Sequence, residues 1–477
     1  MICYRLPGWM FLIAILGMIP SQLHAESKPN RPNVILMMCD DLGYGDLTCF
    51  NADSPIKTPH ISEMAAAGLK FNRFYAAAPV CSPTRGSCLT GRHPYRYGIY
   101  FANQGHLKHK EIALPELLQE AGYATGHFGK WHLGTLTTDI KDANRGGPKN
   151  KQHFSPPQQH GYDVCFVTES KVPTFDPLIA PQKNNGKAWD PLEEGEKSKD
   201  YGTHYWNERG EIVSDNLSGD DSQLIMDRAI PFIEKATQND QPFLAVIWFH
   251  APHLPVVADR KYQQIYPEAS AYERNYYGCV SALDDQVGRL RQSLRELQVD
   301  QNTMLWFCSD NGPEGQANLA PGSAGILSGR KRSLLEGGIR VPGLLEWPAV
   351  VEAGSVTDFA AVTSDYLPTI LDALQLEYPD DRPLDGISLL PAIQRKQSKR
   401  ELPIGFQSAS QIAWMSGNHK IYSSDRGKTW ALFDLVADPA EKNDLAEQNQ
   451  KLLKTLVANV QQWQESCRQS DEEADYR

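Results

Sequence analysis

The chain has 477 residues, 41% of them hydrophobic and 22% charged, which excludes a disordered protein and suits a large folded domain with a smaller one. Its formal net charge of −11 argues against nucleic acid as a partner, because phosphate binding requires a basic face. An anionic ligand must therefore be attracted by a local cluster of cations.

The N-terminal 25 residues have the pattern of a secretory signal peptide. Arg5 precedes a short apolar run at residues 9–20, and a small-residue stretch follows at 21–25. The apolar run is too short to span a bilayer, and no later run reaches about 18 apolar residues, so we expect no stable membrane insertion. An uncleaved anchor is the alternative. We predict an exported protein, whether periplasmic, secreted or in a lysosome-like compartment.

Short apolar runs predict three buried strands, at residues 34–38, 243–249 and 304–307. Amphipathic stretches such as residues 222–236 lie between them and predict helices. This alternation predicts an α/β fold, with a large mixed and mostly parallel sheet sandwiched by helices.

Polar residues follow all three of these strands, with His250 and His253 after the second. Asp40 and Asp41 come after the first, and Asp310 and Asn311 come after the third. In open α/β sheets ligands gather at the carboxyl ends of the strands. Carboxylate and amide oxygens suit Ca²⁺ better than they suit a metal that prefers imidazole. The sequence thus predicts a calcium site. For Asp40 and Asp41, the alternative is a pair of carboxylates that cap the turn before Gly43.

The Cys-x-Pro-x-Arg run at residues 81–85 predicts the start of a helix, because Pro83 suits the first turn. The free N–H groups of that turn would add positive potential beside Cys81. The chain has nine cysteines in all, without a CxxC pair or a Cys/His zinc spacing. One or two disulfides would suit an exported protein, but the sequence does not give their pairing.

Two regions differ in character from the rest. Residues 135–216 are rich in Gly, Pro, Asn, Lys and aromatics, and such long irregular segments are usually functional or mobile. They either shape a binding cleft or form a solvated excursion. Near the C-terminus, residues 412–424 and 428–435 predict antiparallel strands, and residues 441–469 predict one long helix. We predict a main domain at 26–397 and a smaller C-terminal α+β domain with an antiparallel sheet at 398–477.

Five motifs together resemble the formylglycine-dependent (type I) sulfatases, arylsulfatase-like members of the alkaline-phosphatase-like superfamily. They are the acidic metal set described above, CSPTRGSCLTGR at residues 81–92, GKWHLG at 129–134, HAPHLP at 250–255, and SGRK at 328–331 with EGGIRVP at 336–342. The resemblance runs from about Pro32 to the end of the chain. It implies an alkaline-phosphatase-like α/β domain, a bound Ca²⁺ and hydrolysis of sulfate monoesters.

The resemblance also implies how the nucleophile arises. A formylglycine-generating enzyme or maturase would oxidise Cys81 to formylglycine (3-oxoalanine), whose hydrate is the nucleophile. One hydroxyl, bound to Ca²⁺, attacks sulfur, and His132 deprotonates the second hydroxyl so that sulfate is expelled. Arg85 holds the formylglycine and its metal-bound oxygen. The implied metal ligands are Asp40, Asp41, Cys81 as formylglycine, Asp310 and Asn311.

The same resemblance assigns the remaining catalytic and substrate-binding residues. Lys130 and Lys331 bind the sulfate group. His253, together with Lys331, protonates the leaving alcohol, which is worth about 10²–10⁴-fold for a positioned acid. His250 is the alternative to His253. Three aspartates set against a divalent ion, one arginine and two lysines leave an excess of positive charge, and such preorganised charge is usually the largest catalytic effect.

We expect the substrate to be a sulfated carbohydrate. This expectation rests on export, on the habits of the family and on four aromatic residues of the long segment, Trp189, His204, Tyr205 and Trp206. Two other functions compete with it. A phosphonate or phosphate ester hydrolase of the same superfamily is disfavoured by Asn311, where many such relatives carry His. A catalytically dead secreted glycan-binding protein would require Cys81 to stay unmodified.

Overall fold

A computed structural model of the chain describes residues 1–4, 31–184, 188–192 and 195–476. The chain divides into two compact units, Met1–Arg31 and Pro32–Arg477, and the fold below is that of the second. The predicted signal peptide at 1–25 lies outside the described residues, apart from its first four. None of the helices within the described ranges has both the length and the apolar character needed to span a bilayer.

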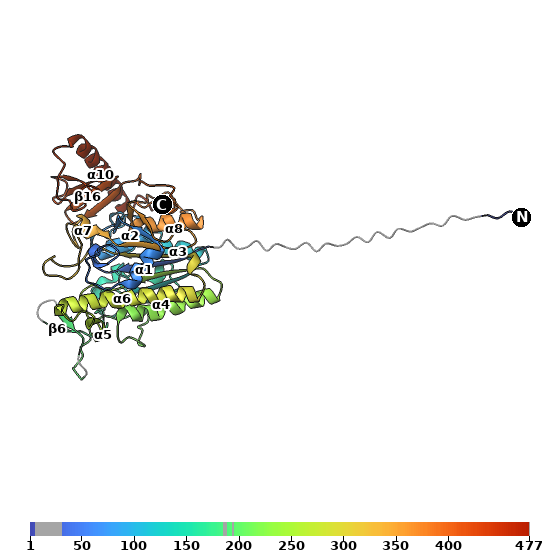
Figure 1. The fold of residues 1–477 in the computed structure, drawn as a ribbon, viewed down its shortest axis with the longest axis horizontal. Helices are drawn as coiled ribbons and strands as arrows, with labels where there is room; N and C mark the ends of the chain where they lie inside the picture. The colour runs from blue at the N-terminus through green and yellow to red at the C-terminus, as the bar shows by residue number, and fades with distance from the viewer. Residues whose placement is uncertain (5–30, 185–187, 193–194, 477) are drawn as a thin grey trace. The chain divides into compact units, whose positions relative to one another are not determined.

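A mixed sheet forms the centre of this second unit (Figure 1). Within the described residues it has nine strands, in the order β13 (Ser355–Thr357), β2 (Leu69–Phe71), β12 (Gly343–Glu346), β10 (Thr303–Ser309), β1 (Asn33–Cys39), β9 (Phe243–Trp248), β4 (Ala124–Lys130), β5 (Val164–Thr168) and β8 (Trp206–Asn207). The run from β10 to β5 is parallel, whereas β12 and β8 are antiparallel to their neighbours in that run. This confirms the predicted mixed, mostly parallel sheet.

Each face of the sheet has its own hydrophobic core, because successive side chains of a strand point to opposite faces. On β1, Leu36 and Met38 pack into one core, and Ile35 and Met37 pack into the other. The first core includes residues of α2 (Cys81–Thr90), α3 (Leu114–Glu120), α8 (Tyr366–Leu374) and α9 (Leu390–Ile393). The second includes residues of α1 (Pro59–Ala67), α4 (Asp221–Gln238), α5 (Arg260–Gln263) and α6 (Ala271–Glu296). The predicted layer of helices on both faces is confirmed (Figure 1).

A smaller antiparallel sheet precedes the C-terminal helix. Its strands pair in chain order, as β15 (Ile404–Ser408), β16 (Gln411–Ser416), β17 (His419–Ser423) and β18 (Ala431–Asp434). One face packs against the main part of the unit, where Phe406 shares a hydrophobic core with Tyr75 and Ile339. The other face packs against α10 (Gln450–Asp471), where Trp414 meets Val460. The predicted smaller α+β part is confirmed, while its boundary at 398 stays a prediction.

The C-terminal helix begins later than predicted, at Gln450 instead of residue 441. Glu441 adopts a φ of 55°, and its carboxylate lies 2.8 Å from the buried Nζ of Lys420. Asp444 accepts hydrogen bonds from the backbone N–H groups of Leu432 and Ala446. These contacts hold the segment against the sheet, and the helix starts only after it. The predicted strand at 412–424 is likewise a hairpin of β16 and β17.

Residues 135–216 are less irregular than predicted, because β5 and β8 belong to the main sheet. Two further strands in the segment, β6 (Gln182–Asn184) and β7 (Ala188–Asp190), pair with each other. The remaining short elements are the sheet of β11 (Arg340–Val341), β3 (Phe74–Tyr75) and β14 (Ala361–Val362), helix α7 (Glu336–Ile339), and the 3₁₀ helices η1 (Tyr44–Asp46), η2 (Pro94–Arg96), η3 (Pro148–His153), η4 (Pro157–His160), η5 (Asp300–Asn302) and η6 (Thr363–Asp365). All nine cysteines lie in described residues, and none of them is in a disulfide there.

Candidate active site

Four of the five residues predicted to bind a metal come together where β1 and β10 end. The two strands are parallel neighbours, so the residues after them emerge at the same edge of the sheet. The backbone N–H of Asp41 donates to Asp310 Oδ1 at 3.2 Å, and Asn311 Nδ2 donates to Asp41 Oδ1 at 2.7 Å. Asp40, Asp41, Asp310 and Asn311 are all buried. The result is a compact, acidic cluster.

Two of the predicted catalytic cations contact this cluster. Arg85 Nη2 lies 2.6 Å from Asp310 Oδ2 and 3.6 Å from Asp40 Oδ2. Lys130 Nζ lies 2.5 Å from Asp40 Oδ2. Burial opposes ionisation of Asp40, but nearby positive charge, above all that of Lys130, holds its pKa well below the usual range. Burial and the charge of Asp40 raise the pKa of Asp310. The cluster therefore requires positive charge around it.

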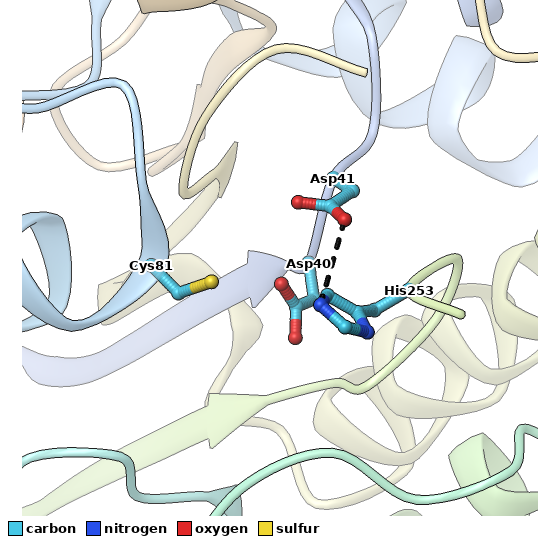
Figure 2. Close-up of side chains that lie close together, drawn as sticks. All are labelled: Asp40, Asp41, Cys81 and His253. Carbon is cyan, nitrogen blue, oxygen red and sulfur yellow. Dashed lines mark ion pairs between the residues drawn. The ribbon is translucent and has the colours of Figure 1, made fainter. Parts of the chain in front are cut away.

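Cys81 and His253 approach the same carboxylates. One ligand atom each of Asp40, Asp41, Cys81 and His253 lie within 4.8 Å of one another. Figure 2 shows the Cys81 sulfur pointing toward Asp40 and the His253 ring facing Asp41. The ring Nε2 of His253 lies 3.7 Å from Asp41 Oδ2, and Lys331 Nζ lies 2.6 Å from Asp41 Oδ1. The four motifs that carry these residues thus converge on one point.

Cys81 is the first residue of α2, as the sequence predicted. The chain enters the helix from Val80, which is extended, and leaves it at Gly91, whose φ of 69° suits a glycine. Arg85 lies one turn along the helix and therefore on the same side as Cys81. Gly86 packs so closely that a Cβ atom there would lie 2.6 Å from the Tyr97 hydroxyl. Helix packing thus fixes the position of Cys81.

The two histidines that competed for one role have different surroundings. His250 is fully buried, with Nδ1 2.7 Å from Asp221 Oδ2 and Nε2 2.7 Å from Thr168 Oγ1. Both of its ring nitrogens are thus engaged. His253 keeps 16% of its side chain exposed, and its Nδ1 lies 2.7 Å from the carbonyl oxygen of Leu254. A carbonyl oxygen can only accept a hydrogen bond, so Nδ1 carries the proton. Nε2 then faces the carboxylates.

His132 lies beside Lys130 but is held by residues that the sequence did not single out. Its backbone adopts a φ of 58°, and its N–H donates to the Glu169 carbonyl at 3.0 Å. The ring Nε2 lies 2.9 Å from Asn103 Oδ1, whereas Nδ1 has no hydrogen-bond partner within the described ranges. Burial, reinforced by the charges of Lys130 and Arg145, holds the pKa of His132 well below the usual range. The imidazole is therefore neutral, and its Nδ1 is free of partners among the described residues.

Three further residues near the site were missed. Glu314 Oε2 lies 3.7 Å from Lys331 Nζ, and Glu314 also pairs with Arg332 at 2.8 Å. The only sequence signal for Glu314 was its position soon after Asp310 and Asn311. Asn103 and Lys171 gave none, because Asn103 lies in an irregular loop and Lys171 follows a strand that was not predicted.

Two of the four aromatic residues taken as a sign of carbohydrate binding are part of the core. Tyr205 is fully buried and stacks on Phe166 with ring centroids 4.2 Å apart. Trp206 is buried on β8, and its Nε1 donates to Asp142 Oδ2 at 3.0 Å. They are enclosed because β8 joins the main sheet, so they do not support a sugar-binding surface.

The residues present fit a calcium ion. Asp40 Oδ1 and Asn311 Oδ1 are buried and lack a hydrogen-bond partner among the described residues. Buried polar oxygens of this kind normally have one. With the carboxylates of Asp41 and Asp310 they form a set of hard oxygen donors, which Ca²⁺ prefers.

Comparison with known proteins agrees with this geometry. The model of the Sulfatase family matches residues 32–376. N-acetylgalactosamine-6-sulfatase of Canis lupus familiaris is 30% identical over 441 residues, covering 89% of this chain and 77% of that protein. Its Homo sapiens counterpart is 31% identical over 424 residues, covering 86% and 74%. The structure of Ps i-CgsB in complex with k-i-k-neocarrahexaose superposes with a TM-score of 0.79 at 28% identity, covering 92% and 94% of the two chains.

The fold and the family match together define a sulfuric ester hydrolase. The chain belongs to the formylglycine-dependent sulfatase family. A phosphonate monoester hydrolase of Agrobacterium radiobacter, with a TM-score of 0.62 at 17% identity, shares the fold alone.

Proposed function

We propose that the protein hydrolyses sulfate esters of a carbohydrate, with formylglycine made from Cys81 as its nucleophile and Ca²⁺ as its metal. The observation that carries the proposal is the cluster of Cys81 with Asp40, Asp41 and His253, whose ligand atoms lie within 4.8 Å. The carbohydrate follows from relatives named N-acetylgalactosamine-6-sulfatase and from a neighbour solved with k-i-k-neocarrahexaose.

An unmodified cysteine would serve poorly at this position. Burial raises the pKa of the Cys81 thiol to about 11, although Lys130 and Lys331 oppose this. A protonated thiol is a weak nucleophile. A formylglycine would supply hydroxyl groups there instead, and it requires a formylglycine-generating enzyme or maturase as a partner.

The metal would be held by Asp40, Asp41, Asp310, Asn311 and the modified residue 81. It would supply positive charge that makes a bound hydroxyl more acidic and neutralises the sulfate oxygens. Lys130 adds fixed positive charge beside Asp40 and Lys331 beside Asp41, and Arg85 holds Asp310 in place. Because these groups are buried and already positioned, they need no reorganisation when charge develops on the substrate.

Two histidines and a lysine carry out the proton transfers. His132 is neutral and has Nδ1 without a partner among the described residues, so it accepts a proton from the nucleophile's side. Burial lowers the pKa of His253 to about 4, so we infer that it carries a proton only once the anionic ester lies beside it. The charge of Asp41 raises the pKa of Lys331 against the effect of burial, so this lysine carries a proton before the leaving alcohol departs. His253 and Lys331 together protonate the leaving alcohol.

The proposal extends to organisation and compartment. Residues 1–25 would be removed on export, to a periplasmic, extracellular or lysosome-like location. The catalytic domain would span residues 26–397 and the C-terminal part 398–477, with the latter packed on the former through Phe406 and Ile339.

The test is a desulfation screen over defined sulfated oligosaccharides, using protein matured by a co-expressed formylglycine-generating enzyme. Sulfate release is measured, and Cys81→Ala serves as the matched control. We expect release from at least one oligosaccharide by the matured protein and none by the variant. Hydrolysis of a phosphonate monoester without any sulfate release would replace the proposal with the phosphonate hydrolase alternative.

A further inference from the structure

Lys171 lies at the same edge of the sheet as the active site. β4 and β5 are parallel, with Lys130 opposite Thr168. The pairing continues past both strands, because the His132 N–H donates to the Glu169 carbonyl at 3.0 Å. Lys171 follows two residues later. It therefore extends the segment that runs beside the sulfate-binding lysine and the proposed base.

The ammonium group of Lys171 differs from the other cations of the site because it lacks a counter-ion. Arg85, Lys130 and Lys331 each contact an aspartate. Lys171 is partly buried, yet within the described ranges its Nζ takes part in no hydrogen bond or ion pair. Burial lowers the pKa of Lys171, and the like charges of Lys130 and Lys331 lower it further. The pairing of β4 with β5, continued by the bond between His132 and Glu169, places the backbone of Lys171 at the same sheet edge as Lys130.

The carboxylates that could neutralise Lys171 are already engaged. Its neighbour Glu169 is buried and bound by Arg145 at 3.1 Å and by the backbone N–H of Asn144 at 3.1 Å. Glu314 binds Arg332. A partly buried charge without a partner costs free energy, so its retention beside the substrate position calls for an anionic ligand.

A simple sulfate monoester does not provide that ligand. The ester carries one negative charge, and the proposed Ca²⁺ with Arg85, Lys130 and Lys331 already exceeds the charge of the three aspartates. Lys171 adds a further cation beyond those that hold the ester. Charged groups in binding sites are arranged to be complementary to the charges of the ligand.

We propose that Lys171 binds a second anionic group of the substrate, either a carboxylate or another sulfate, close to the ester that is hydrolysed. The inference rests on the proposed function and narrows it, because the substrate is then a polyanionic saccharide. A charge-assisted hydrogen bond from Lys171 to that group would select such saccharides over singly charged sulfate esters.

Competition experiments test this. Inhibition of 4-nitrophenyl sulfate hydrolysis is measured with three probes: N-acetylgalactosamine 6-sulfate, its 4,6-disulfate, and a disaccharide that joins the 6-sulfate to a uronic acid. Wild type, Lys171→Gln and the control Lys235→Gln are compared. Lys235 is exposed in the last turn of α4, which leads to the amino end of β9. The control thus loses the same charge at the opposite edge of the sheet.

We expect wild type and Lys235→Gln to bind a doubly charged probe about tenfold more tightly than the singly charged one, and Lys171→Gln to lose that preference. If Lys171→Gln loses the preference for the disulfate, the second group is a sulfate. If it loses the preference for the disaccharide, the second group is a carboxylate. An unchanged preference in Lys171→Gln, equal weakening of all three probes, or no preference in wild type would overturn the inference.

A different result would contradict the proposed function. If matured wild type releases no sulfate from any ester, that function is wrong, whatever Lys171 does. Calorimetric titration of the same three probes into the same three proteins then still measures the preference. The two failures can therefore be told apart.

Discussion

Asp41 connects more of the site than any other single side chain. Its carboxylate accepts hydrogen bonds from Lys331 and Asn311 and faces His253. Its backbone φ of 72° lies in the left-handed region, which costs roughly 1–2 kcal/mol for most residues but less for aspartate. The carboxylate's contacts offset this cost, and the turn directs Asp40 and Asp41 to different partners.

The difference between the two histidines can be tested with two substrates. We predict that His253→Ala lowers kcat about 10²–10⁴-fold on a carbohydrate sulfate, because a poor leaving group needs a proton. The loss on 4-nitrophenyl sulfate should be much smaller, because nitrophenolate leaves without one. Steady-state kinetics on both substrates measures the effect.

His250→Ala is the control for this prediction. Its loss leaves Asp221 and Thr168 without a buried partner, so we expect about 1–3 kcal/mol lower stability in denaturant unfolding. The ratio of kcat on the carbohydrate sulfate to kcat on 4-nitrophenyl sulfate should stay that of wild type. An equal loss on both substrates in His253→Ala would refute its role as the acid for the leaving group.

At the scale of residues, the sequence singled out candidates that lie inside motifs and missed residues that only tertiary structure brings to the site. Asp40, Asp310 and Lys130 were found because each ends a strand or sits in a distinctive block. Lys171 was missed because β5 was not predicted, and Asn103 because its contact with His132 joins two loops. Such contacts depend on tertiary structure, which local patterns do not encode.

At the scale of elements, strands with continuous apolar runs were predicted well. β1 and β9 were each found within one or two residues, because buried parallel strands carry apolar side chains on both faces. The start of α10 was misplaced, because Glu441 turns away to reach Lys420. A helical pattern in the sequence cannot show that a buried ion pair competes for one of its residues.

Helix α10 is attached to the rest of the molecule through Asp385. Arg96 binds its carboxylate through Nε at 2.7 Å and Nη2 at 2.9 Å, and Trp463 of α10 donates to it at 2.9 Å. Burial raises the pKa of Asp385, but Arg96 outweighs this and lowers it to about 2. The lowered pKa means that the ionised form stabilises the folded state.

We predict that Asp385→Asn lowers the free energy of unfolding by about 2–3 kcal/mol at neutral pH. In wild type this contribution is fully present above about pH 4 and is lost as the pH falls toward 2, because the unfolded carboxyl then takes up a proton first. Denaturant unfolding should therefore show that the difference in the free energy of unfolding between wild type and Asp385→Asn shrinks over that pH range.

Asp53→Asn provides the comparison, because Asp53 is exposed and its replacement should change stability little at any pH. A difference between wild type and Asp385→Asn that stays constant from pH 7 to pH 2 would contradict the electrostatic attachment of α10.

At the scale of the whole molecule, the C-terminal sheet and the active-site loop share a buried ion cluster. Lys420 of β17 lies 2.9 Å from Glu336 and 2.8 Å from Glu441. Glu336 begins the EGG block, five residues after Lys331. Buried charges that lose a partner are costly. The C-terminal part therefore helps to fix the loop that carries Lys331.

Metal removal should weaken the whole fold. We predict that EGTA lowers the thermal unfolding temperature and abolishes activity, and that added Ca²⁺ restores both, since a ligand at a hundredfold excess over its Kd stabilises by about 2.7 kcal/mol. Asp310→Ala should not respond to Ca²⁺ in the same scan. Stoichiometric Ca²⁺ in purified Asp310→Ala, found by elemental analysis, would refute its place among the ligands.

The mass of the tryptic peptide covering residues 74–85, taken from active protein, tests the central claim most directly. The account predicts that residue 81 has lost two hydrogens and exchanged its sulfur for oxygen, as formylglycine requires. A peptide that retains an intact cysteine thiol, in a preparation that hydrolyses sulfate esters at full rate, would contradict it.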